Sequence, residues 1–244
     1  MRIMDAKVQF FWIEDGSVDS AEIIIFIPML LDLLFPNRCL HCNRIIQGDH
    51  LVCELCFVQV HFTHWNFLDD NELKHKCTLL FPVQHAFSLM HFEEEGLSRK
   101  IIHALKYSGR EKAGLVIADW TADRVDFGTK KPDLLVTVPL HPKKLRKRGY
   151  NQLHHFTEKL SEQWQIPFDH ELIRRNYNRK AQALQDKSHR KQTENLFSLT
   201  KPVQHRHILI IDDVFTTGNT MSAVAWEILK SGNTTVSVLV MALD

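Results

Sequence analysis

The sequence predicts an α/β protein in which helices flank a parallel β-sheet, with a small zinc-binding module near the N-terminus. The first observation is a pair of short apolar runs, residues 134–140 and 208–211, which suit strands that are covered on both faces. The second is that segments with helical periodicity alternate with these runs, as they do in βαβ units. The third is a set of four paired cysteines, Cys39, Cys42, Cys53 and Cys56.

Length and charge limit the classes of protein to consider. A chain of 244 residues is long enough for one substantial core and a small appendage. The net charge of +1 gives no general attraction to nucleic acid or membranes, so any polyanion binding has to be local. Four of the five cysteines lie in two close pairs, which favours a metal site over a disulfide framework, because nothing marks the chain as secreted. We therefore expect a cytoplasmic protein.

An apolar stretch at residues 23–35 raises the question of a membrane segment. Pro28 and Asp32 interrupt it, whereas a spanning helix needs about 18 uninterrupted apolar residues. Acidic residues precede it and no small-residue cleavage site follows, which argues against a secretory signal. We expect no membrane span, an N-terminal extension over residues 1–27, and a short amphipathic helix at 28–35 that packs on a neighbouring domain or a partner.

The cysteines form two C-x2-C knuckles that are separated by ten residues. Such knuckles bring four thiolates to one tetrahedral centre, which is the geometry of structural zinc sites. The alternatives are unmetallated thiols or two disulfides. Because protein fills all four positions, we expect a structural metal held by Cys39, Cys42, Cys53 and Cys56. This module and an aromatic connector extend over residues 28–79, where the lone Cys77 is expected to serve packing.

The larger domain is expected over residues 80–244. Its apolar positions alternate between strand-like runs and helical periods, which predicts a parallel sheet with helices on both faces. The elements expected before the last motif are a strand at 83–90, helices at 97–105 and 113–125, a strand at 134–140 and a helix at 151–164.

Two basic segments follow the strand at 134–140. Residues 141–152, HPKKLRKRGYNQ, are expected to form a loop beyond the carboxyl end of that strand, where open α/β sheets bind ligands. Their charge suits a pyrophosphate, and Gly149 lets backbone N–H groups approach an anion. A solvated basic turn and a contact to nucleic acid phosphates are the alternatives. Residues 172–190 form either a lid over the substrate or an exposed surface segment.

Residues 207–222, HILIIDDVFTTGNTMS, carry the most specific chemistry. The apolar run at 208–211 predicts a strand, and it stops at Asp212 and Asp213, which are expected at the carboxyl end of that strand. Apolar positions at helical spacing predict a helix over 221–229. The N-terminus of a helix is an anion site, because its first N–H groups lack backbone partners. Adjacent carboxylates suit two neighbouring hydroxyls, with a divalent cation nearby. A ribose 5-phosphate supplies both features.

This string resembles the phosphoribosyl-pyrophosphate (PRPP) motif of type I phosphoribosyltransferases, in which an aliphatic triplet precedes Asp-Asp, two variable residues, Thr-Thr-Gly, one variable residue and Thr. Over roughly residues 28–244 the chain is similar to the ComF family, whose members resemble these enzymes, carry an N-terminal zinc-binding segment and are linked to DNA uptake. The resemblance rests on the knuckles, LKYSGR, VPLHPKKLRKRGYNQ, an Arg/Gln segment ending at Arg190, and IDDVFTTGNT. The chain departs from the family at Cys77, where many relatives have a further cysteine pair, and at Thr193, where they tend to have Asn.

The resemblance implies a role for individual residues. Asp212 and Asp213 would hold the ribose hydroxyls of PRPP, and Mg²⁺ would accompany the substrate. The 5-phosphate would lie against Thr216, Thr217, Gly218, Asn219 and Thr220. The pyrophosphate would lie against Gly149 and Arg148, and the basic segment would contribute Arg179, Gln182 and Arg190. Of these, Arg148, Arg179 and Arg190 are the expected catalytic residues.

Three functions are compatible with these observations. The first is a phosphoribosyltransferase that displaces pyrophosphate from PRPP with an unidentified acceptor. The second is a non-catalytic DNA-uptake factor that senses PRPP or a nucleotide. The third is a protein that binds single-stranded nucleic acid through the zinc module and the basic segment from Lys143 to Arg148. DNA-uptake proteins are further expected partners.

Overall fold

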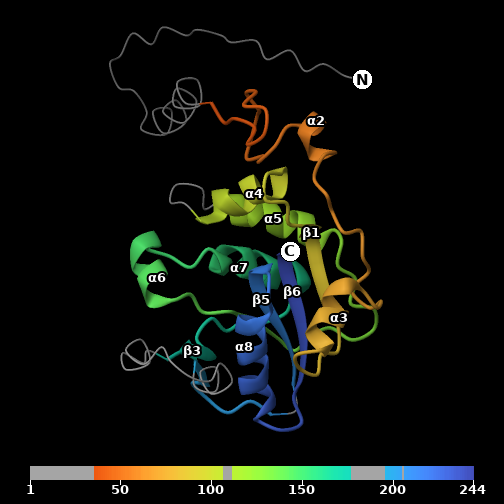
Figure 1. The fold of residues 1–244 in the computed structure, drawn as a ribbon, viewed down its shortest axis with the longest axis vertical. Coiled ribbons are helices and arrows are strands. Elements are labelled where there is room, and N and C mark those ends of the chain that lie inside the picture. Colours follow the sequence, from red (N-terminus) through yellow and green to blue (C-terminus); the bar gives the residue numbers. More distant parts are fainter. Residues whose placement is uncertain (1–35, 107–111, 177–195, 205) are drawn as a thin grey trace, which may run out of the picture. The chain divides into compact units, whose positions relative to one another are not determined.

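The computed structural model describes residues 36–106, 112–176, 196–204 and 206–244 (Figure 1). The chain divides into two compact units, Met1–Asn37 and Arg38–Asp244. The extension and the short helix expected before residue 36 lie outside the described residues. Among the residues that are described, no helix combines the length and the apolar character needed to cross a membrane.

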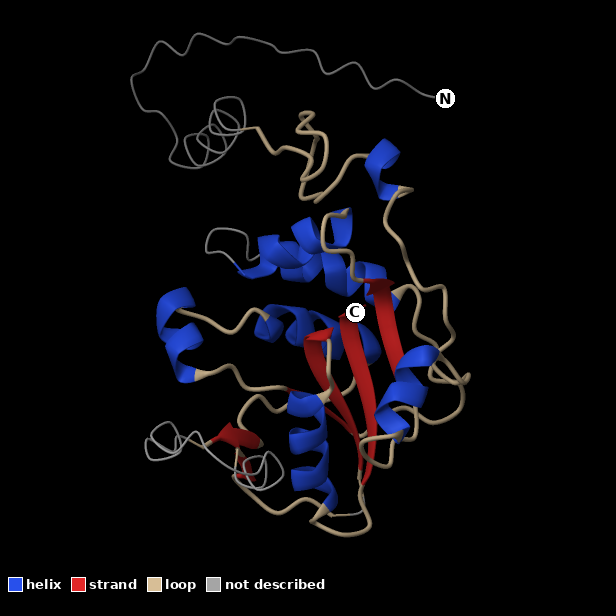
Figure 2. Ribbon diagram, viewed as in Figure 1, coloured by secondary structure: helices blue, strands red, loops and turns tan. Residues whose placement is uncertain are grey.

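A parallel sheet forms the centre of the unit Arg38–Asp244. Its strand order is β1-β6-β5-β2, and each described pairing between neighbours is parallel (Figure 2). The strands are β1 Ala86–His91, β2 Leu134–Thr137, β5 His207–Phe215 and β6 Thr235–Leu243. The predicted fold class is confirmed, although β6, which pairs with both β1 and β5, is absent from the expectations drawn from the sequence.

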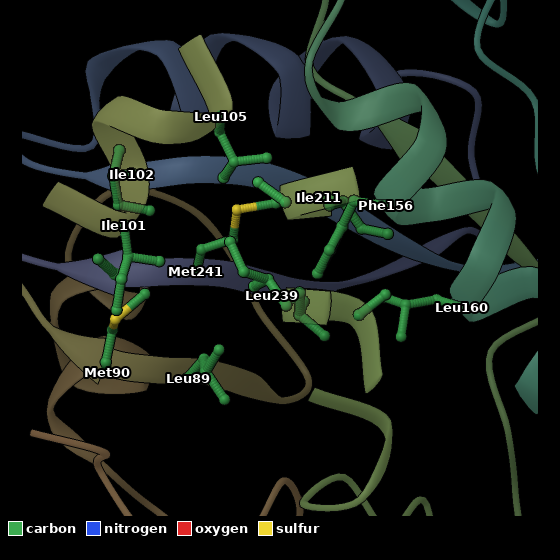
Figure 3. Close-up of a cluster of buried hydrophobic side chains, with 14 of the residues drawn as sticks. Leu89, Met90, Ile101, Ile102, Leu105, Phe156, Leu160, Ile211, Leu239 and Met241 are labelled. Carbon is green, nitrogen blue, oxygen red and sulfur yellow. The ribbon is translucent and has the colours of Figure 1, made fainter. Parts of the chain in front are cut away.

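Helices cover both faces of the sheet. Leu209 and Ile211 of β5 belong to one buried cluster, whereas Ile208 and Ile210 belong to another, because successive side chains of a strand point to opposite faces. Figure 3 shows part of the first cluster, where side chains of α4 and α7 meet those of β5 and β6. The helices on this face are α4 Leu97–Lys106, α5 Lys112–Ala122 and α7 Leu153–Trp164, and those on the other are α3 Glu72–Thr78 and α8 Asn219–Leu229. Burial on both faces explains why the strand sequences are continuously apolar.

The acidic pair lies near the carboxyl end of β5, as expected, and the strand extends beyond the apolar run at 208–211. Strand β5 continues through Asp212 and Asp213 to Phe215. The physical reason is that β6 keeps offering backbone partners along this stretch, where Asp212 lies opposite Val240 and Phe215 lies opposite Leu243. The acidic pair is therefore held on a paired strand.

The basic segment at residues 141–152 also differs from the expected loop, because it contains the helix α6 Pro142–Arg148. Pro142 occupies the first turn, and the His141 side chain accepts a hydrogen bond from the Lys143 N–H at 3.2 Å. Gly149 ends the helix with φ 80° and donates its N–H to the Leu145 carbonyl. Proline in the first turn and glycine just after the last turn are typical of a short helix. The interpretation as a loop gave more weight to the run of charged residues between them.

A two-stranded antiparallel sheet lies outside the main sheet. It pairs β3 Ile173–Arg175 with β4 Phe197–Leu199. Residues 177–195 connect these strands and lie outside the described residues, so most of the expected lid lies there too.

The four paired cysteines come together in one cluster. Their Sγ atoms all lie within 4.8 Å of one another, and Cys42 Sγ lies 3.7 Å from Cys53 Sγ. A tetrahedral zinc site with Zn–S bonds near 2.3 Å requires sulfur atoms about 3.8 Å apart, so the residues fit the metal. All four thiols are free of disulfides. Burial raises the pKa of the Cys39 thiol, but backbone N–H groups of Cys42, Cys53 and His41 outweigh it and lower the pKa to about 6, which favours a thiolate ligand.

The zinc module packs on the same helices that cover the sheet. Cys39 and Cys56 belong to the buried cluster of α4 and α5. Phe57 is the last residue of the short helix α2 Glu54–Phe57, and its ring centroid lies 5.2 Å from that of Trp120 of α5. Lys112 of α5 forms an ion pair of 2.6 Å with Asp49 in the module. These contacts join the cysteine cluster to the sheet through α5.

The fifth cysteine has a packing role. Cys77 of α3 is fully buried among apolar residues of the second cluster. Burial raises the pKa of its thiol to about 12, so it stays protonated at neutral pH. The expectation for a lone packing cysteine is confirmed.

We predict that the purified chain contains one zinc ion and that Cys53→Ser removes it. Loss of the ion leaves three thiolates together and releases the module from α5, so we expect a lower unfolding temperature. Metal content by elemental analysis and thermal unfolding measure both effects. Cys77→Ser is the matched control, because it removes a thiol and is expected to leave the zinc content unchanged. Full zinc occupancy in Cys53→Ser would contradict the assignment.

We also predict that His207 makes the protein sensitive to acid. Burial, with a smaller effect of His85, lowers the pKa of His207 to about 4, and its Nε2 lies 2.7 Å from Ser237 Oγ. Between the unfolded pKa of 6.5 and the folded value, the unfolded chain binds more protons. The contribution of His207 is therefore complete above about pH 6.5 and is lost as pH falls towards 4, on the order of 2 kcal/mol after allowance for screening.

The measurement is the free energy of unfolding against pH for the wild type and His207→Gln. The glutamine amide can still bond to Ser237 but does not titrate here, so a shallower fall in stability below pH 6.5 is expected. The pKa of His154 is also lowered to about 4, mainly by burial, so the fall is reduced and not abolished. The exposed His75 is changed to Gln as the control. Equal slopes in all three proteins would exclude His207 as a source of acid sensitivity.

Candidate functional site

The candidate site lies at the carboxyl end of β5, where the chain turns into α8 (Figure 1). Residues 216–218 connect the strand to the helix. A small cavity of about 60 Å³ lies here and includes Asp212 in its wall. Its other lining residues are Val214, Phe215, Thr216, Thr217, Gly218, Asn219, Thr220 and Met221. The structure thus brings one of the two acidic residues and all five predicted phosphate contacts to one pocket.

Gly218 determines the shape of this turn. It has φ +73°, and a Cβ atom built on it would lie 2.4 Å from Leu80 Cδ1 and 2.6 Å from Phe215 Cζ. A side chain is therefore excluded by packing as well as by backbone conformation. Gly218 is the N-cap of α8, and among the described residues no side chain caps this helix, so the amides of its first turn remain available to an anion. Thr216, Thr217 and Asn219 are exposed beside them.

The acidic pair is held by a dense set of hydrogen bonds. Asp212 Oδ1 accepts the Asp213 N–H at 2.8 Å, and Asp213 Oδ1 accepts the Val214 N–H at 2.8 Å. Burial raises the pKa of Asp212 well above its usual value, and the neighbouring charge of Asp213 raises it further. Two carboxylates this close can share a proton, which lets the pair both donate to and accept from sugar hydroxyls.

A chain of polar contacts joins the acidic pair to the segment that the sequence assigns to pyrophosphate. Arg148 Nη1 donates to Gln152 Oε1 at 2.7 Å, and Gln152 Nε2 donates to Asp213 Oδ2 at 3.0 Å. Lys106, the last residue of α4, places its Nζ 3.2 Å from the same Asp213 oxygen. Arg148 is therefore within two hydrogen bonds of the acidic pair, as the predicted site requires.

Gly149 has a structural part in this arrangement. Its N–H is used by the Leu145 carbonyl, and a Cβ atom on Gly149 would meet nothing within 4 Å. The glycine is needed for its φ of 80° and for ending α6, rather than for close approach of other backbone. Arg179, Gln182 and Arg190 lie outside the described residues.

Three residues near the acidic pair were not singled out from the sequence, namely Lys106, Gln152 and Arg175. Arg175 of β3 is half-buried, and its guanidinium carbon lies 5.2 Å from the centre of the Phe197 ring. Burial lowers the pKa of Arg175, whereas the nearby Asp212 raises it. Each residue lies in a motif or basic segment noted in the sequence, but only the fold shows that their side chains converge.

The site fits magnesium only together with a substrate. Among the described residues, the one group of three or more potential metal ligands within reach of one another is the cysteine cluster. The acidic pair offers two carboxylates, and Mg²⁺ in such sites takes further oxygens from phosphates and water. A diphosphate held near Arg148 would supply those oxygens.

Comparison with known proteins matches the cysteine module to a family model and most of the chain to named relatives. Residues 30–67 match the model of the double zinc ribbon domain. The chain is 33% identical over 206 residues to the DNA utilization protein YhgH of Shigella flexneri, covering 82% of this chain and 87% of that protein. A shorter alignment, 34% identical over 144 residues, covers 57% of this chain and 63% of the protein of the same name from Escherichia coli O157:H7.

A second relative and a solved structure complete the comparison. Adenine phosphoribosyltransferase of Leishmania donovani aligns with a TM-score of 0.36 and 13% identity, over 73% of this chain and 84% of that one. The competence protein ComFC of Bacillus subtilis is 33% identical over 198 residues, which cover 80% of this chain and 72% of that protein. With alignments to YhgH and ComFC that extend over most of each protein, the chain belongs to the ComF family.

Proposed function

We propose that this protein binds PRPP and transfers its phosphoribosyl group to an acceptor, with release of pyrophosphate. The observation that carries the proposal is the pocket in which the turn at residues 216–218, the open start of α8 and Asp212 meet. A phosphate needs unpaired N–H groups, and a ribose needs acceptors for two adjacent hydroxyls. Both kinds of group lie within one small cavity.

In this proposal the reaction is a displacement at C1 of the ribose. The bond from C1 to the pyrophosphate oxygen breaks, a bond from C1 to the acceptor forms, and the acceptor loses a proton. Asp212 and Asp213 hold the 2- and 3-hydroxyls, and the amides of Thr217, Gly218 and Asn219 hold the 5-phosphate. No protein nucleophile is required, because positive charge develops on the ribose and the main task is to position the reactants.

Charge on the leaving pyrophosphate is met by cations from several segments. Arg148 is held towards the site by Gln152, and Arg175 is close enough to Asp212 for the negative charge of Asp212 to raise its pKa. Arg179 and Arg190 belong to the same proposal through the family resemblance. Mg²⁺ bound to the diphosphate would neutralise the developing charge. Gln152 links Arg148 to Asp213, which ties this basic side chain to the acidic pair.

The biological setting follows from the relatives. Their names connect them with DNA utilization and with competence, and we propose that this chain acts in the same processes in the cytoplasm. A non-catalytic protein that senses PRPP is the alternative, and turnover separates the two.

We predict that Mg²⁺ and PRPP bind to the wild type and that the double variant Asp212→Ala, Asp213→Ala binds about 100-fold more weakly or not at all. Each carboxylate loses hydrogen bonds to a sugar hydroxyl that are worth on the order of 1.5–3 kcal/mol. Isothermal titration calorimetry gives the affinities. Thr200→Ala, a change on the surface away from the pocket, is the control.

Unchanged affinity in the double variant would place the sugar elsewhere. Pyrophosphate release in the presence of a panel of bases and amines then tests turnover. Binding without release across a broad panel would favour the sensing protein over the transferase.

A second function, binding of single-stranded nucleic acid, is favoured by one feature of α6. None of its residues is buried, and Lys143, Lys144, Arg146 and Lys147 are exposed in one short helix next to the site. Such a local cluster can contact a phosphate backbone in a chain whose net charge is only +1. The helix α6 lies at the edge of the proposed pyrophosphate site. A single-stranded nucleic acid that bound to α6 would therefore bring one of its ends close to the ribose.

We predict that the triple variant Lys143→Ala, Lys144→Ala, Lys147→Ala binds a single-stranded oligonucleotide more weakly. The slope of log affinity against log salt concentration should fall by about 2, since each lost phosphate contact contributes about 0.7. Fluorescence anisotropy at several salt concentrations measures both quantities. The triple change Lys130→Ala, Lys201→Ala, Lys230→Ala alters net charge equally at other exposed positions and is the control. Equal effects of the two variants would reject α6 as a specific contact.

A further inference from the structure

The ammonium group of Lys106 places a positive charge beside the proposed ribose site. It is the last residue of α4, and its Nζ lies 3.2 Å from Asp213 Oδ2. Their side chains are 28% and 17% exposed, so water and salt screen the ion pair less than they screen a surface pair. The sequence gives Lys106 no role, because its partner lies more than 100 residues away along the chain.

The end of α4 is fixed where this contact is made. Leu105 is buried in the first cluster, and its carbonyl accepts a hydrogen bond from the Tyr150 hydroxyl at 2.9 Å. Tyr150 and Gln152 come from the same short stretch, and Gln152 donates to the oxygen that Lys106 also contacts. The end of α4 and the segment that carries Gln152 are therefore joined beside Asp213.

Asp213 already has a donor on each of its oxygens. The Val214 N–H occupies Oδ1, and Gln152 and Lys106 occupy Oδ2. A carboxylate has about four lone-pair positions, so a position remains for a sugar hydroxyl. Once a sugar hydroxyl takes that position, a divalent cation could coordinate Asp213 only by displacing one of its donors, and Mg²⁺ demands near-ideal octahedral geometry.

We propose that Lys106 is the resident cation of the ribose site, so that ribose 5-phosphate binds without a divalent metal ion and Mg²⁺ is needed only for the diphosphate. The inference rests on the proposed function and assigns separate roles in it to Lys106 and to the metal ion. Lys106 neutralises and orients Asp213 for the sugar, whereas the metal ion serves the leaving group. It is a positioning residue, since it acts through Asp213.

The test uses ribose 5-phosphate, which has no diphosphate, titrated in Mg²⁺-free buffer and in saturating Mg²⁺. The Mg²⁺-free buffer contains no chelator, so that the structural zinc stays bound. The wild type should bind equally in both, within about twofold. Lys106→Met should bind about tenfold more weakly without Mg²⁺, the equivalent of about 1.4 kcal/mol, because the charge on Asp213 is then uncompensated. Added Mg²⁺ should restore part of that loss, since it can supply the missing charge. A residue with a merely structural role would not respond to the metal ion in this way.

Two further variants act as controls. Lys106→Arg keeps the charge and should bind as the wild type does. Lys100→Met removes an exposed lysine from an earlier turn of α4 and should leave binding unchanged. Thermal unfolding checks that each variant is folded, and the wild-type comparison with and without Mg²⁺ remains decisive if Lys106→Met is not.

The outcomes separate the inference from the proposed function. A wild type that binds ribose 5-phosphate only with Mg²⁺ overturns the inference and leaves the proposed function standing. Unchanged affinity of Lys106→Met in Mg²⁺-free buffer overturns it as well. No binding of ribose 5-phosphate to the wild type in either condition rejects the proposed site itself, and the role of Lys106 is rejected with it.

Discussion

The pairing of β5 with neighbours on both sides is the constraint on which the rest of the structure depends. Strand β5 lies between β2 and β6, and its apolar residues are covered by helices on both faces. A strand fixed in this way presents its carboxyl end at a defined place, and the pairing with β6 extends through Asp212 and Asp213. The carboxylates therefore start from a rigid backbone, which is where a precise binding site is best built. The turn at Gly218 adds the helix amides at a fixed distance from them.

Asp213 connects segments that are far apart in the sequence. Through its Oδ2 atom it joins Lys106 at the end of α4 with Gln152 at the start of α7, and Gln152 continues the chain of contacts to Arg148. The three conspicuous motifs of the sequence meet at this one atom. This meeting gives a physical reason for all three motifs to occur in one chain. One motif carries the partly buried carboxylate, and the other two supply the hydrogen bond and the positive charge that it needs.

The sequence predicts those parts of the protein whose structure is determined by residues close together in the chain. The apolar runs of β2 and β5, the periodicity of α4 and α7 and the spacing of the cysteines are set by neighbouring residues, and the structure confirms these elements. Strand β6 was not predicted, although its residues are apolar, and α6 was interpreted as a loop because its charges drew more attention than Pro142 and Gly149. The contacts of Lys106, Gln152 and Arg175 could not be predicted, since they depend on how distant elements cross at the edge of the sheet. The roles of the site residues remain predictions drawn from the motif.

The zinc module has a place in this arrangement that follows from its packing. Cys39 and Cys56 lie in the same buried cluster as Ile101 and Leu105 of α4, so the metal-organised loop completes the apolar cover of that helix. A short loop with few apolar residues cannot stay ordered alone, and a structural metal supplies the missing stability. Because Lys106 follows Leu105 directly, the order of the cysteine cluster and the position of the cation beside Asp213 are coupled through one helix. The metal is then remote from the proposed chemistry and still contributes to the geometry on which that chemistry depends.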